Sequence, residues 1–140
     1  MGCDIHLILE KKIGANWVGV SLFNGFHTRN YPHTVYPIAV DRSYARFSAL
    51  AGVRGDGPPP RGVPDDISVL AKSIVDEYGN DGHSHSWLPL VDATKIFMAT
   101  NFRPGFEPDE LPWCEWPTNY FFNVDDTEAN HHRLVFFFDN

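Results

Sequence analysis

The sequence predicts an α+β domain: a mainly antiparallel sheet whose N- and C-terminal strands are adjacent, packed by two or three helices. Three segments predict it. Residues 3–10 alternate in polarity, residues 67–78 place apolar side chains at helical spacing, and residues 133–140 form an apolar, β-forming end. Long segments rich in proline and glycine lie between these elements, so we expect irregular loops to connect them.

Size and composition restrict the class of protein. A length of 140 residues favours a single domain over residues 1–140. The net charge of −7 argues against general nucleic-acid binding, which needs a basic surface, and leaves small ligands or a basic protein as partners. No apolar run reaches the roughly 18 residues of a membrane span. Cys3 and Cys114 do not make a disulfide scaffold, which favours a reducing cytoplasm.

The N-terminal segment predicts a hairpin. One alternating set is Cys3, Ile5, Leu7 and Leu9, and the other is Asp4, His6, Ile8 and Glu10. Residues 13–16 supply a turn, and residues 17–20 return as a second strand. Asp4 and His6 therefore share one face, with Cys3 on the other. This separation disfavours a Cys3–His6 nucleophile pair, so we interpret Cys3 as a small buried residue.

Helical spacing predicts three helices, over residues 42–51, about 67–78 and about 92–100. The residues expected to begin or end them are Asp41 and Gly52, Asp65 or Asp66 with Gly79, and Asp92. The helix ending near Tyr78 has the most regular pattern. It leads directly into the segment with the most potential metal ligands.

The C-terminal segment 133–140 is apolar on both faces, which is typical of a central strand covered on both sides. We expect it to lie beside the N-terminal strand. Residues 20–40 and 101–119 are interpreted as loops, with Trp113 and Trp116 as exposed rings and a short strand at residues 120–122.

Residues 81–86 contain one aspartate and two histidines within five positions. In an extended strand Asp81, His83 and His85 would project from one face. Imidazoles at i and i+2 with a carboxylate can bind one metal ion, and Asp4 with His6 can complete the set. We therefore expect a divalent metal, Zn²⁺ by ligand type, whose bound water attacks a substrate.

The expected metal ligands are Asp4, His6, His83 and His85, and the expected catalytic residues are Asp81, His83 and His85. Two other interpretations stay open. The histidines can form a structural polar cluster that satisfies loop carbonyls, or they can carry protons without a metal.

The proline-rich segment 53–64 carries two arginines that could hold an anionic group. Guanidinium groups suit phosphate and carboxylate oxygens, so Arg54 and Arg61 are candidate substrate-binding residues. The alternative is a structural salt bridge from Arg61 to Asp65 or Asp66.

Several strings together resemble a family of small proteins encoded by tailed phages and prophages. They are residues 1–6 (MGCDIH), 41–44 (DRSY), 50–54 (LAGVR), 60–68 (PRGVPDDIS), 81–88 (DGHSHSWL) and 135–140 (VFFFDN). This chain has Ser43 where members usually have Asn, and Phe137 where they usually have Trp. The resemblance implies a phage protein acting in the host bacterial cytoplasm, and it implies no activity.

We expect a phage-encoded metal-dependent hydrolase acting on a phosphoester or nucleotide-type small molecule, with a counter-defence role suggested by the phage context. The alternative is a non-enzymatic protein that sequesters a host nucleotide signal or inhibits a host protein. Both hypotheses name the same partners, a small anionic ligand or a host protein, and expect no membrane association.

Overall fold

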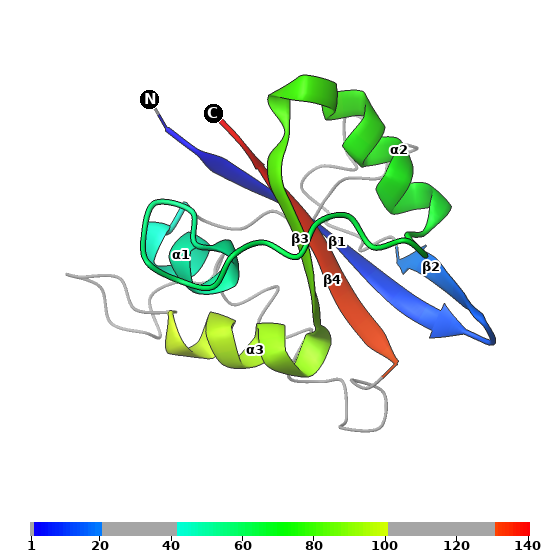
Figure 1. Ribbon diagram of the computed structural model, residues 1–140. Helices are drawn as coiled ribbons and strands as arrows, with labels where there is room; N and C mark the ends of the chain where they lie inside the picture. Colours follow the sequence, from blue (N-terminus) through cyan, green and yellow to red (C-terminus); the bar gives the residue numbers. More distant parts are fainter. Residues whose placement is uncertain (1, 21–41, 101–130) are drawn as a thin grey trace, which may run out of the picture.

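The computed structural model describes residues 2–20, 42–100 and 131–140 (Figure 1). Its elements are β1 (Asp4–Ile13), β2 (Asn16–Val20), α1 (Tyr44–Ala51), α2 (Val69–Tyr78), the 3-10 turn η1 (Gly79–Asp81), β3 (His83–Pro89), α3 (Leu90–Ala99) and β4 (His132–Asp139). This confirms the predicted α+β class.

The strands form one sheet in the order β2-β1-β4-β3, and every neighbouring pair is antiparallel. The C-terminal strand β4 is therefore central and lies beside β1, as its apolar pattern predicted (Figure 1). The register pairs His6 with Phe137 and Asp4 with Asp139. The first and last strands of the chain thus bring Asp4 and His6 beside residues 137–139.

Each face of the sheet packs against different helices. On one face α1 and α3 cover a core that includes Leu7, Leu9, Phe136 and Phe138. On the other face α2 contributes Ala71 and Ile74 to a smaller core with Ile8, Val135 and Phe137. Odd positions of β1 and even positions of β4 contact α1 and α3, so alternation assigns His6 and Asp139 to the α2 face.

The helix boundaries refine the predicted ones. Ser43 caps α1, which ends at Gly52 in the left-handed conformation with a φ of 69°, as expected of a glycine there. The prediction that Asp41 caps this helix is therefore wrong, because the helix begins two residues later than expected, at Tyr44. Helix α3 begins at Leu90, immediately after β3, so Asp92 lies in its first turn rather than before it.

The prediction that Asp65 or Asp66 caps α2 is wrong. Ser68 is the cap, and its hydroxyl accepts a hydrogen bond from the Ala71 amide at 3.1 Å. The cause is tertiary: Glu10 accepts the Ser68 amide at 2.7 Å, and Arg133 binds Asp66. These contacts fix where the helix starts.

Some expectations fall on other segments of the chain. Val20, the first residue of the predicted loop 20–40, ends β2. The rest of that loop, the loop at 101–119, the proposed strand at 120–122, Trp113, Trp116 and Cys114 lie outside the described residues. Among the helices that the structure describes, none has the length and apolar character needed to cross a bilayer.

Candidate functional site

Strand β3 contains an irregularity at its start. His83 pairs with Phe138 and Ser86 pairs with Phe136. An advance of three residues along β3 therefore corresponds to an advance of two residues along β4. The extra residue forms a β-bulge, and Ser84 within it has a φ of 53°, in the left-handed region. Regular alternation therefore fails between His83 and Ser86.

The bulge separates the two histidines. His83 stacks beside Phe138, a residue of the α1 and α3 core, with ring centroids 6.2 Å apart. His85 stacks beside Phe137, a residue of the α2 core, at 5.4 Å. Asp81 lies before the strand, exposed in η1. The expectation that Asp81, His83 and His85 share one strand face is therefore wrong.

On the α2 face, His6 and His85 flank the buried Phe137 ring. The His6 and His85 ring centroids lie 5.0 Å and 5.4 Å from that of Phe137, with interplanar angles of 27° and 23°. Tyr78, at the end of α2, lies 4.3 Å from His6. Asp139 completes the group, with Oδ1 3.3 Å from His6 Nε2. We call these five residues the histidine cluster.

Two nitrogens of the histidine cluster are buried without a hydrogen-bond partner. In the described part of the chain, the buried side-chain nitrogens and oxygens left without one are Nε2 of His6 and Nε2 of His85. His6 Nε2 is within ion-pair distance of Asp139, but the pair lacks hydrogen-bond geometry. Buried polar atoms are nearly always paired, so two unpaired ones at one place indicate a site for an external hydrogen-bonding group.

A glycine gives His85 Nε2 its space. A Cβ on Gly82 would lie 3.3 Å from His85 Nε2 and 3.1 Å from the Phe137 ring. Both distances are tighter than ordinary van der Waals contact, so a larger residue would press on the two rings. Gly82 therefore matters for its close approach to the histidine cluster.

Burial sets the electrostatics of the histidine cluster. Desolvation lowers the pKa of His85, and the nearby His83 lowers it further. His85 is therefore a neutral imidazole near pH 7, with one nitrogen able to donate and the other to accept. Desolvation likewise raises the pKa of Tyr78, with a contribution from Asp139, so its hydroxyl stays protonated.

The predicted four-residue metal centre is not assembled. Asp4 Oδ1 accepts two hydrogen bonds from Arg42, at 2.9 Å and 2.7 Å. His83 lies on the opposite face and contacts Asn140. Across the ranges 2–20, 42–100 and 131–140, no three His, Cys, Asp or Glu side chains are grouped to hold a metal ion. Of the predicted ligands, only His6 and His85 lie in the histidine cluster.

The two predicted substrate-binding arginines contact different elements. The Arg54 guanidinium lies 5.3 Å from the Tyr44 ring at the start of α1. Arg61 lies 5.0 Å from the Trp87 ring on β3. Asp66 forms its salt bridge with Arg133 and not with Arg61, the alternative partner considered from the sequence. Neither arginine contacts the histidine cluster through these interactions.

Cys3 occupies the structural role expected of it. Its side chain is fully buried in the α1 and α3 core. Burial raises the pKa of its thiol, and the opposing effect of Arg54 is smaller. A thiol that resists ionisation is a poor nucleophile, so Cys3 does not belong to the candidate site.

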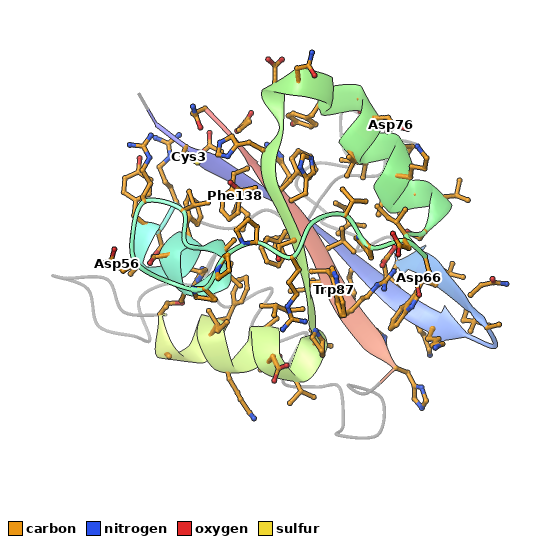
Figure 2. All side chains as sticks on the ribbon, in the orientation of Figure 1. Cys3, Asp56, Asp66, Asp76, Trp87 and Phe138 are labelled. Carbon is orange, nitrogen blue, oxygen red and sulfur yellow. The ribbon has the colours of Figure 1, made fainter. Side chains whose placement is uncertain are left out.

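A second polar group on the α2 face was not identified from the sequence. The fully buried Glu10 carboxylate accepts Arg133 Nε at 2.5 Å and the Ser68 amide at 2.7 Å. Arg133 also donates to Asp66 Oδ1 at 2.8 Å and lies 4.2 Å from the Trp17 ring. We call Glu10, Arg133, Asp66 and Ser68 the arginine network. Figure 2 shows Asp66 near Trp87, toward β2, and Cys3 toward the chain termini.

The sequence held a weak signal for the missed cluster residue Asp139. It has the same parity as Phe137 in the C-terminal strand, and this strand was expected beside the N-terminal one. The sequence does not give the register that pairs Phe137 with His6. A shift of one residue in that register would place Asp139 on the other face of the sheet.

Comparison with protein-family models, with curated proteins and with solved structures finds no match for this chain. The functional argument therefore depends on the geometry of the site.

Proposed function

We propose that the chain is a phage protein that hydrolyses a small phosphoester or nucleotide-type molecule in the host cytoplasm, using the histidine cluster. One observation carries the proposal: the buried Nε2 atoms of His6 and His85, on either side of Phe137, have no hydrogen-bond partner in the described chain. The phage origin and the cytoplasmic location come from the sequence resemblance alone.

The geometry supports proton transfer by His6 and Asp139. An imidazole beside a carboxylate can take a proton from water as the water oxygen attacks phosphorus. Asp139, 3.3 Å away, would stabilise the imidazolium. The phosphorus–oxygen ester bond then breaks, and His6 returns the proton to the leaving oxygen. His85, neutral because its pKa is lowered, would hold the substrate by a hydrogen bond.

This proposal uses the histidines without the four-ligand zinc centre expected from the sequence. Asp4 and His83 are bound elsewhere, which leaves His6, His85 and Asp139 as the reactive groups on the α2 face. Zinc content is therefore part of the test. If the purified protein contains zinc, and the zinc content falls equally in the His83→Ala and His85→Ala variants, the result would support the metal centre instead.

The main experiment incubates the purified protein with a panel of linear and cyclic nucleotides and phosphodiesters, with product detection by mass spectrometry. His6→Ala and Asp139→Asn should each lower turnover at least about 100-fold, the usual effect of losing an acid–base group. His131→Ala, at an exposed histidine before β4, is the matched control and should retain full turnover. Unchanged turnover in both cluster variants would contradict the proposal.

A non-enzymatic binder is the second candidate. The half-buried ring of Tyr78 beside His6 favours it, because a planar ligand can stack on an aromatic ring while it hydrogen-bonds to imidazole. A binder would retain the nucleotide, and the nucleotide would be recovered unchanged after denaturation. Recovery of a cleaved product would eliminate this candidate.

A further inference from the structure

On the opposite face of the sheet, His83 makes two hydrogen-bonding contacts that are independent of the histidine cluster. Its Nδ1 lies 3.0 Å from the Ser84 hydroxyl oxygen. Its Nε2 lies 2.5 Å from Asn140 Oδ1. An amide oxygen can only accept, so His83 Nε2 carries the proton in the neutral ring. Nδ1 is then the acceptor for the Ser84 hydroxyl proton.

This arrangement has the parts of an activated nucleophile. A serine hydroxyl donates to an imidazole, and a third group fixes the tautomer of that imidazole. Ser84 and His83 are half-buried, so a small solute can reach them. Adjacent side chains often share a hydrogen bond, and this contact alone would not indicate chemistry. The contact to Asn140, distant in sequence, supplies the orienting group.

The backbone at Ser84 is a further, independent observation. Its φ of 53° lies in the left-handed region, which is unfavourable for a residue other than glycine. Serine nucleophiles on sharp strand turns occupy strained conformations of this kind, because the turn exposes the hydroxyl.

The neighbouring proline-rich loop holds the bulge in place. The Gly62 amide donates to the His85 carbonyl at 2.8 Å, and the Arg61 amide donates to the Ser86 hydroxyl at 3.0 Å. Residues 58–60 are prolines without an N–H, so Arg61 and Gly62 provide the first donors after them. Figure 1 shows this loop crossing β3. The backbone around Ser84 is therefore fixed from outside the sheet.

We propose that Ser84, His83 and Asn140 form a second reactive site, in which Ser84 is a nucleophile toward carboxylic or phosphorus esters. Ser84 Oγ bonds to the carbonyl carbon or phosphorus while its proton passes to His83 Nδ1. The leaving oxygen departs with that proton. Water then cleaves the ester on Ser84 by the reverse proton path, which restores the serine and releases the acid.

The test uses a fluorophosphonate probe on the full chain, with intact mass and peptide mapping as readouts. In the expected reaction a bond forms between Ser84 Oγ and phosphorus, and fluoride leaves. Wild type should gain one label, located on Ser84. Ser84→Gly should gain none, and Ser73→Ala, at an exposed serine on α2, should label as wild type. His83→Gln should slow labelling at least about 100-fold, and Asn140→Ala about tenfold.

The design keeps folding and reactivity separate. Glycine is at ease at positive φ, so Ser84→Gly should unfold at the same temperature as wild type or higher. A folded wild-type protein without label, a label at another residue, or a Ser84→Gly variant that still reacts would each overturn the proposal. Hydrolysis at the histidine cluster is a separate measurement, because His6→Ala should leave labelling of Ser84 unchanged.

Discussion

The two ends of the α2 face carry polar side chains on the same strands, yet they differ in how those side chains are satisfied. Toward β2, the charges of Glu10 and Arg133 bind each other, and Asp66 and the Ser68 amide complete the arginine network. Toward the chain termini, the histidine cluster leaves two buried nitrogens unpaired. The arginine network satisfies its polar groups within the chain, whereas the histidine cluster leaves these two nitrogens available for a water molecule or another external group.

This difference separates structural from functional polar residues better than residue type does. Glu10 and Arg133 are a carboxylate and a guanidinium in direct contact, and residue type alone would make them a plausible catalytic pair. Their hydrogen bonds fix the start of α2 and join it to the sheet. The predictions that follow test whether the two ends respond to substitution as this comparison requires.

The largest effect is expected at the arginine network. Arg133→Met leaves the carboxylate of Glu10, which is fully buried, without its cationic partner. Breaking a buried ion pair from one side costs about 3–5 kcal/mol, so the free energy of unfolding should fall by that amount. Urea unfolding followed by tryptophan fluorescence measures it.

Arg61→Met is the matched control, because Arg61 also lies over Trp87 but is exposed. It should change the free energy of unfolding by less than about 1 kcal/mol. Equal losses in the two variants would show that cation–π stacking, rather than the pair with Glu10, stabilises this end.

The opposite result is expected at the histidine cluster. His85→Leu removes a buried nitrogen that has no partner, so no hydrogen bond to the protein is lost at Nε2. Stability should stay within about 1 kcal/mol of wild type, while nucleotide turnover or binding falls sharply. A large loss of stability with unchanged function would assign His85 to the core instead.

The sequence predicted the elements well because local patterns determine them. Alternation in residues 3–10, the apolar run in 133–140, helical spacing in 67–78 and the glycines at 52 and 79 each act over a few residues. The sequence did not predict the bulge at Ser84, because a bulge depends on the pairing of β3 with β4 and on the hydrogen bonds from the neighbouring loop. The bulge at that one residue places His83 on the face of the sheet opposite to His85.

The arginine network escaped prediction for a related reason. Glu10 and Arg133 are 123 positions apart, and only the register between β1 and β4 makes them partners. The same register created the contact between His6 and Asp139. Register is determined by the packing of whole faces, so residues that depend on it cannot be identified from local spacing.

The next prediction concerns the pH dependence of stability, which also separates the histidine cluster from the arginine network. The folded pKa of His85 is lowered, so the unfolded chain binds a proton more readily than the folded one. Stability should therefore fall as pH drops below about 6.5, the ordinary histidine value, toward the folded pKa. His85→Leu should remove this component of the pH dependence. Identical profiles of unfolding free energy against pH for wild type and His85→Leu between pH 7 and 5 would contradict this prediction.

The smallest effect is expected at Asp66, the exposed edge of the arginine network. Arg133 lowers the pKa of this carboxyl through a hydrogen bond, so its contribution to stability is present above about pH 4 and is lost as pH falls through the folded pKa. Its side chain is 63% exposed, so Asp66→Asn should cost less than about 1 kcal/mol at pH 7. The variant should lose less stability than wild type below about pH 4, and above about pH 5 its stability should change with pH as that of wild type does. If Asp66→Asn instead alters the pH dependence of stability above about pH 5, the arginine network and the histidine cluster are coupled through β4.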